Sequence, residues 1–303
     1  MLNKLVAIKI DVDTDRGTRI GVPNLLALFR ERGISATFLF SLGPDNTGRA
    51  IKRIFRKGFL QKVQRTSVVS TYGLRTLLNG VLLPGPHIGR RNEAIMRSAR
   101  EQGHEVGIHC YDHIRWQDGL AKMTAPEVKA EFSKAQREFR RIFSAPAHTA
   151  GAAGWQANAY SLAAYDDAKL AYASDARGQF PFYPRIENTV YKTLQIPGNL
   201  PTLDELLGRP EYPQTKLSSH YLSLLRTDRP NILTIHAEVE GMQMLDWFSE
   251  FLQQAQRESI EFAPLITVAQ DFCKNPQSIP VCDLVAGEID GRSGTLALQK
   301  CMN

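Results

Sequence analysis

The sequence predicts an α/β fold built on a mainly parallel sheet, either open or closed into a barrel. Short runs rich in β-branched and aromatic residues alternate along the chain with segments of helical periodicity. Such alternation is typical of parallel strands joined by crossover helices. With 303 residues, of which 43% are hydrophobic and 22% charged, the chain can bury a large core. In a fold of this class the functional side chains are expected at the carboxyl ends of the strands.

The first strand is expected at residues 5–13, and the helix after it begins near Pro23 and ends at Gly33. Proline suits the first turn of a helix, and glycine suits its C-terminal end. A long helix opens on Thr124 and Glu127, which have the spacing of a capping box. Further strands are predicted at 35–43, 104–113 and 231–241. Helices are predicted at 92–103, 124–143, 158–168, 214–227 and 245–258. The segments 169–178 and 194–201 lie between the helix at 158–168 and the helix at 214–227.

One domain is expected over residues 1–274, with an insertion at about 45–91 after the second strand. The tail at 275–303 is rich in proline and glycine and is expected to be a C-terminal appendage rather than a second domain.

A cationic segment lies between Asn46 and Asn92, where the chain has no acidic residue, although the net charge of the whole chain is only +6. Residues 48–65 place apolar side chains on one stripe of a predicted helix with lysine and arginine around it, and 77–85 add an apolar stretch. A basic amphipathic helix is typical of a segment that lies on an anionic lipid surface. We therefore predict membrane contacts for Lys52, Arg53, Phe55, Arg56 and Phe59.

Two other interpretations of this charge remain open. The helix could pack on its own barrel with a solvated basic face. A nucleic-acid partner would also explain the charge, but the sequence has no helix-turn-helix, RRM-like or zinc-finger signature, so none is expected.

The cysteines Cys110, Cys273, Cys282 and Cys301 form no CxxC pair and have no regular spacing. We therefore expect neither a thiolate metal site nor a disulfide scaffold, and we expect a reducing compartment. The apolar stretch at the start is too short for a signal peptide, and no run reaches the roughly 20 apolar residues of a membrane-spanning helix. The protein is expected in the cytosol or on a membrane surface.

The first predicted strand ends in three aspartates, Asp11, Asp13 and Asp15, spaced two apart. A calcium loop of the EF-hand type is excluded, because Arg16 and Val22 stand where that loop needs glycine and glutamate. A Mg²⁺-dependent phosphatase with a D-x-D aspartate nucleophile stays open, although it does not account for the histidines described next. Solvated loop acids or helix caps, in a basic binding module without enzymatic activity, are the remaining alternative.

His109 and His113 lie four residues apart where the third predicted strand ends. Two imidazoles and one carboxylate are ligands for Zn²⁺ and similar ions, and they leave coordination positions open for water and substrate, as catalytic sites require. A second aspartate beside the metal can then serve as general base. His236 ends a late strand, where it could protonate a departing amine, so it suits the role of general acid.

Together these residues resemble the polysaccharide deacetylases of the NodB-homology class, which are similar to carbohydrate esterase family 4. The matching segments are IDVDTDRGTRIGVP, FSLGPDNTGR, GIHCYDH, AAGWQ, SDARG, QIPGNLPTLDELLGR and TIHAEVEG, which extend to about residue 272. The resemblance implies a metal-dependent amide hydrolase on a distorted seven-stranded (β/α) barrel. Within the family the chain is similar to the deformylases that act on undecaprenyl-phosphate-linked 4-deoxy-4-formamido-L-arabinose in lipid A modification. Such enzymes imply a peripheral position at the cytoplasmic face of the bacterial inner membrane.

The resemblance also implies roles for single residues. Asp11 is the expected general base and His236 the expected general acid, while Asp13, His109 and His113 are the expected ligands of a divalent Zn, Co or Mn ion.

Four more residues follow from the match or from its departures. Asp175 matches an acidic residue that tunes the acid histidine, and Trp155 is expected to line the sugar pocket. The family's third motif, with its arginine and proline, is absent here. Arg177 or Arg16 is therefore expected to orient Asp11.

Overall fold

The structure is a computed structural model that describes residues 4–50, 76, 78–81 and 83–301. The predicted membrane residues Lys52, Arg53, Phe55, Arg56 and Phe59 lie outside the described residues, as does most of the predicted basic helix. In the part of the chain that is described, no helix combines the length and apolar character needed to cross a membrane.

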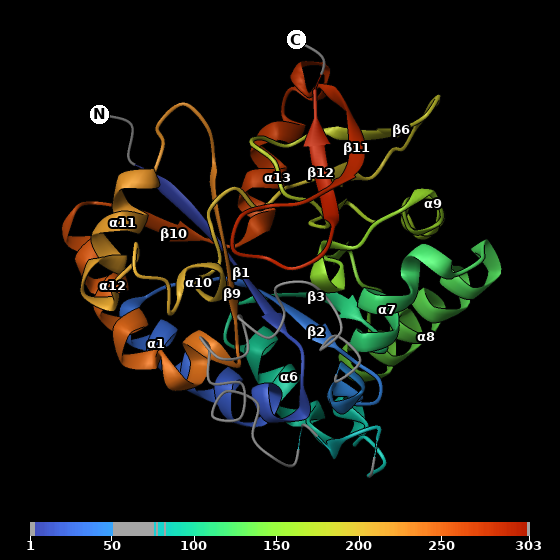
Figure 1. Cartoon of the computed structure of the whole chain (residues 1–303), viewed down its shortest axis with the longest axis horizontal. Helices are drawn as coiled ribbons and strands as arrows, with labels where there is room; N and C mark the ends of the chain where they lie inside the picture. Colours follow the sequence, from blue (N-terminus) through green and yellow to red (C-terminus); the bar gives the residue numbers. More distant parts are fainter. Residues whose placement is uncertain (1–3, 51–75, 77, 82, 302–303) are drawn as a thin grey trace.

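A curled sheet of seven parallel strands forms the centre of the molecule (Figure 1). In spatial order the strands are β9 (Asn231–His236), β1 (Leu5–Val12), β2 (Thr37–Ser41), β3 (Glu105–Cys110), β4 (Thr149–Ala150), β5 (Tyr172–Ala173) and β8 (Leu194–Gln195), with β10 (Glu261–Ala263) beside the start of β1. After β8 the backbone N–H of Leu200 donates to the carbonyl of Ile232 in β9 at 3.3 Å, so the two edges of the sheet approach each other. The predicted α/β fold with a seven-stranded curled sheet is confirmed.

Helices cover the outside of this sheet, with α1 and α12 on one side and α7 and α8 on the other (Figure 1). Their bounds are α1 (Val22–Arg32), α5 (Ile88–Arg91), α6 (Glu93–Glu101), α7 (His113–Gly119), α8 (Ala125–Phe143), α9 (Ala159–Ala168), α10 (Leu203–Leu206), α11 (Leu217–Leu224), α12 (Leu245–Arg257) and α13 (Leu265–Cys273). Gly33 ends α1 with a φ of 64°, a left-handed conformation that glycine adopts without steric cost. Thr124 and Glu127 form the predicted capping box of α8.

Short helical turns connect several elements. They are the π-helices η1 (Gly17–Gly21) and η6 (Val239–Gln243) and the 3₁₀ turns η3 (Leu120–Lys122), η4 (Ala153–Trp155), η5 (Gln214–Lys216) and η7 (Pro276–Ser278). The predicted helix at 214–227 is divided into η5 and α11 and ends at Leu224, three residues early.

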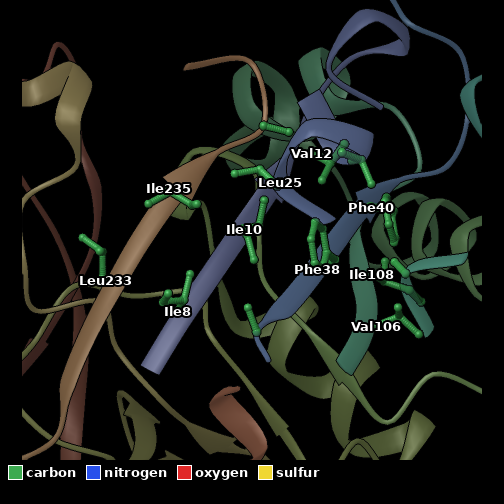
Figure 2. Packing of buried hydrophobic residues seen from close by; sticks show 14 of the residues in the cluster. Ile8, Ile10, Val12, Leu25, Phe38, Phe40, Val106, Ile108, Leu233 and Ile235 are labelled. Carbon is green, nitrogen blue, oxygen red and sulfur yellow. The ribbon is translucent and has the colours of Figure 1, made fainter. Parts of the chain in front are cut away.

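Side chains that alternate along β1 belong either to the hydrophobic core or to the inner face of the sheet. Figure 2 shows Ile8, Ile10 and Val12 packed with Leu25 of α1 and with apolar side chains of the neighbouring strands. Successive side chains of a strand point to opposite faces, so the residues between them lie on the inner face of the curled sheet. Lys9 and Asp11 are therefore on that inner face, and both are buried.

The tail forms part of a second, four-stranded sheet. Strands β11 (Val281–Gly287) and β12 (Leu296–Lys300) pair antiparallel, and β11 also pairs with β6 (Tyr183–Ile186), which pairs with β7 (Thr189–Val190). The register Asp283↔Lys300 places the preceding and following residues, Cys282 and Cys301, opposite each other, and they form a disulfide with a Cα–Cα distance of 4.4 Å. The cysteine spacing gave no indication of this single disulfide, because spacing along the sequence does not show which strands pair.

Candidate metal centre

Residues from three strands meet at one end of the inner face. Asp11 and the following Asp13 come from the end of β1, His109 from the end of β3 and His236 from the end of β9. Asp11 and His236 are paired in register on adjacent strands. His113 begins α7, three residues after β3 ends. Because the strands are parallel, their carboxyl ends lie at the same rim, as expected from the fold class.

Asp13, His109 and His113 form a group whose donor atoms all lie within 4.8 Å of one another. The Nε2 atom of His109 lies 3.2 Å from Asp13 Oδ1, and the Nε2 atom of His113 lies 3.4 Å from Asp13 Oδ2. Ligands at 2.0–2.1 Å from a tetrahedral cation are about 3.3 Å apart, so these separations fit a zinc-like ion. Asp13 Oδ1 is also buried without a hydrogen-bond partner, as expected of an oxygen reserved for a cation.

Neighbouring groups orient His109 and Asp13. His109 Nδ1 lies 2.7 Å from the carbonyl oxygen of Gly151, an arrangement that places the ring proton on Nδ1 and leaves Nε2 with its lone pair toward the cluster. The backbone N–H of Asp13 donates to Glu238 Oε1 at 3.1 Å. Burial opposes ionisation of Asp13, but the charges of His113 and His109 lower its pKa overall.

Lys9 lies beneath Asp11 and was missed by the sequence analysis. Its side chain is fully buried, and Nζ lies 3.2 Å from Asp11 Oδ2. The signal was present, because Lys9, Asp11 and Asp13 are spaced two apart on a predicted strand and so share one face. The other oxygen, Asp11 Oδ1, is buried without a hydrogen-bond partner.

Glu240 contacts His236, and the sequence did not single it out. The backbone N–H of His236 donates to Glu240 Oε2 at 2.9 Å. Burial raises the pKa of Glu240 to about 7, while the charge of His236 acts in the opposite direction. His236 is paired in register with Asp11 on the adjacent strand, two residues before Asp13.

Asp175 is fully buried, and both of its oxygens are engaged. Oδ1 accepts the backbone N–H of Ala152 at 2.6 Å, and Oδ2 accepts the side-chain amide of Gln195 at 3.0 Å. Burial raises the pKa of Asp175 to about 6, partly offset by the hydrogen bonds from Gln195 and Ala152 and by the charges of Lys9 and His109. The hydrogen bonds described for Asp175 do not include His236, so its tuning role stays a prediction.

Trp155 is only 1% exposed, so its ring is covered rather than open to a sugar. Three cations surround it, with Lys9 Nζ at 5.1 Å, Arg177 Cζ at 5.3 Å and Arg292 Cζ at 4.3 Å from the ring centre. Arg292 comes from the tail, and no pattern in the sequence pointed to it. The sugar-pocket role of Trp155 stays a prediction.

Of the two arginines expected to orient Asp11, Arg177 is engaged by other groups, and the role of Arg16 stays a prediction. Arg177 donates to Glu205 at 2.7 Å and to the carbonyls of Gly198 and Leu200 at 3.0 and 2.9 Å. Arg16 is half-buried just before η1. The cation beside Asp11 is Lys9.

Comparison with known proteins extends these observations. The model of the family described as "Polysaccharide deacetylase" matches residues 4–173, more than half of the chain. A protein of Shewanella sediminis named "Probable 4-deoxy-4-formamido-L-arabinose-phosphoundecaprenol deformylase ArnD" is 38% identical over 98% of this chain and 95% of its own length. A protein of the same name from Wigglesworthia glossinidia brevipalpis is 33% identical over 94% of this chain and 98% of its own.

The fold has a counterpart among solved structures. A crystal structure described as a polysaccharide deacetylase from Mycobacterium smegmatis superposes with a TM-score of 0.66 at 15% identity, over 95% of this chain and 96% of that one. These matches support neither a D-x-D phosphatase nor a binding module without enzymatic activity. Enzymes of the matched family depend on a metal ion, and Asp13, His109 and His113 offer a His/Asp site for one. The chain therefore belongs to the polysaccharide deacetylase family.

Proposed function

We propose that the protein is a metal-dependent deformylase that releases formate from 4-deoxy-4-formamido-L-arabinose carried on undecaprenyl phosphate. The observation that supports it most directly is the Asp13, His109 and His113 cluster, with Asp11 and His236 beside it at the same rim. The substrate class follows from the two deformylases that resemble the chain over nearly its whole length.

A cation held by Asp13, His109 and His113 would supply Lewis-acid polarisation of the formamide carbonyl and lower the pKa of water. Asp11 accepts the proton of the attacking water, because its Oδ1 oxygen is buried and has no other hydrogen-bond donor. His236 stands on the adjacent strand and donates a proton to the sugar nitrogen as the C–N bond breaks. Formate and the free amino sugar are the products, so one water is consumed for each amide bond.

The donor atoms limit which metal ions can bind, but they do not select a single one. Two imidazole nitrogens and one carboxylate oxygen suit Zn²⁺, Co²⁺ and Mn²⁺. Each of these ions is to be loaded separately in the experiment below.

We extend the proposal to the protein's position at the cytoplasmic face of the bacterial inner membrane, on anionic lipid. The cationic segment from Asn46 to Asn92 supports it, since the substrate is anchored in that membrane by its polyprenyl chain. An apolar turn, defined here as Leu78, Gly80, Val81 and Leu83, adds to this, because Val81 is 53% and Leu83 43% exposed.

The direct test measures formate released from the lipid-linked formamido sugar by protein loaded with each metal. We expect release that stops with a chelator and returns on adding metal. A His109→Ala His113→Ala variant should bind no metal and release no formate. A matched control is His220→Ala, since His220 lies on α11, outside the metal cluster.

Two outcomes oppose different parts of the proposal. Unchanged release in chelator excludes the metal mechanism. No release from metal-loaded protein excludes this substrate, and the acetyl analogue then tests whether another acyl group is removed.

A further inference from the structure

Lys9 has an unusual position for a lysine. It lies in the middle of β1 with none of its surface exposed. A buried ammonium group is stable only when it is paired and hydrogen-bonded. Its partners are Asp11 Oδ2 at 3.2 Å, the carbonyl of Ser174 at 3.2 Å and the face of the Trp155 ring at 5.1 Å.

These partners come from three separate parts of the chain. Ser174 directly follows β5, and Trp155 ends η4, so Lys9 connects β1 across the inner face of the sheet to both. Its positive charge also opposes, in small part, the burial that raises the pKa of Asp175. The side chain is thus held from several directions, and it holds the Asp11 carboxylate in turn.

The contact distinguishes the two oxygens of Asp11. Oδ2 is held by Lys9, while Oδ1 has no hydrogen-bond donor. Oδ1 lies 3.7 Å from His109 Nδ1, but that nitrogen is 2.7 Å from the Gly151 carbonyl, its closer partner. Oδ1 is therefore the oxygen left to accept a proton next to the metal cluster.

We propose that Lys9 is the positioning residue of Asp11: it holds Oδ2 and so presents Oδ1 to the attacking water. This inference rests on the proposed function, because it takes Asp11 as the general base. Arg177 does not perform this task, since its guanidinium is engaged by Glu205 and by two backbone carbonyls.

A double-mutant cycle separates positioning from a structural role. We expect Lys9→Met to lower kcat by roughly 10²- to 10⁴-fold, the range of a lost general base, with KM and metal stoichiometry nearly unchanged. Asp11→Asn should cause a similar loss. The Lys9→Met Asp11→Asn double variant should be no slower than Asp11→Asn, because residues that act as one unit are not additive. Losses that multiply would overturn the proposal.

Thr37→Val provides a matched control. Thr37 is also buried on the inner face, but its hydroxyl donates to Glu105 rather than to Asp11. Any loss that it causes in kcat should multiply with the loss from Asp11→Asn.

A second variant covers the case in which Lys9→Met does not fold. Lys9→Arg keeps the cation and should retain activity within about tenfold of the wild type, whereas Lys9→Gln should lose most of it. A fully active Lys9→Gln variant would overturn the role of the charge.

A crystal structure of a folded variant tests, without any substrate, whether Lys9 orients the Asp11 carboxylate. In Lys9→Met or Lys9→Gln the Asp11 carboxylate should rotate away from its wild-type orientation, and an unchanged orientation would overturn the proposal. If the wild type releases no formate, the proposed function fails separately, and this comparison still tests Lys9.

Discussion

Single residues on the inner face of the sheet determine the chemistry of this protein. On β1, Ile8 and Ile10 pack outward in the core, while Lys9 and Asp11 face inward. A shift of one residue in the pairing of β1 would exchange these two sets. The burial of the isoleucines therefore fixes the register that places Asp11 opposite His236.

Glu240 makes the stability of the protein depend on pH. Burial raises the pKa of its carboxyl from 4.5 to about 7 in the folded protein. Between these values the folded protein binds this proton more tightly than the unfolded chain does, so the free energy of unfolding falls as pH rises through this window. The loss amounts to roughly 3 kcal/mol when the pH has passed the folded pKa.

We predict that Glu240→Gln removes most of this decline, because an amide does not titrate in this range. Urea unfolding at several pH values across the window measures the free energy of unfolding of each protein. Glu250→Gln is the matched control, since Glu250 is exposed on α12 and should leave the decline unchanged. An equally steep decline in Glu240→Gln would show that other groups cause it.

At the scale of elements, the apolar turn is tied to the metal centre. Arg49 Nε donates to the carbonyl of Gly80 at 3.0 Å, and the N–H of Gly48 donates to the carbonyl of Asn79 at 3.0 Å. In the same loop, Asn46 donates to Asp112 Oδ2 at 2.7 Å, and Asp112 caps the helix that begins with His113. A membrane that contacts the apolar turn would therefore lie near the metal centre.

We predict that Val81→Asp Leu83→Asp weakens binding to vesicles containing phosphatidylglycerol by roughly tenfold or more, because both apolar contact and charge attraction are reduced. Formate release from substrate in vesicles should fall in parallel, while release from a short-chain soluble substrate should not change. Co-sedimentation with vesicles measures the binding.

Val190→Asp Val281→Asp is the charge-matched control for the turn. Val190 and Val281 are 48% and 42% exposed on β7 and β11, in the smaller sheet. Equal weakening by both double variants would mean that net charge, rather than the turn, governs membrane binding.

At the scale of the whole molecule, the tail is joined to the residues around the site. The side-chain amide of Gln156 donates to the carbonyl of Thr295 at 2.7 Å, and Arg292 Nη1 lies 3.5 Å from Glu205. With Arg292 also stacked on Trp155, the segment that leads into β12 covers the ring that Lys9 contacts on the inner face. The disulfide Cys282–Cys301 fixes β11 to β12 and so holds this cover in place.

We predict that Cys282→Ser Cys301→Ser lowers the free energy of unfolding by about 3 kcal/mol, the value for closing a loop of this length in the unfolded chain. Urea unfolding with and without a reductant measures it, and reductant should have no effect on the double variant. Cys273→Ser is the control, since Cys273 is free and exposed. A wild type insensitive to reductant would contradict the prediction.

Local patterns were enough to predict much of this protein. Strand and helix periodicity gave the α/β fold, and the Thr124–Glu127 capping box and Gly33 marked helix ends correctly. That Asp13, His109 and His113 lie close together could be anticipated, because parallel strands bring their carboxyl ends to one rim. Their assignment as metal ligands came from the family resemblance and stays a prediction. The other inferences use residues close together in the chain or a general property of the fold class.

The remaining features depend on which distant segments pack together. The role of Lys9 depends on its contacts with Asp11 and with Ser174, which is 165 residues away in the chain. The disulfide depends on the antiparallel register of β11 and β12, and the cover over Trp155 depends on where the tail returns. Periodicity in a sequence reports which face of an element is apolar, but it does not report the partner that the face will meet. The pairing of buried charges is therefore decided only when the packed chain excludes water from both partners.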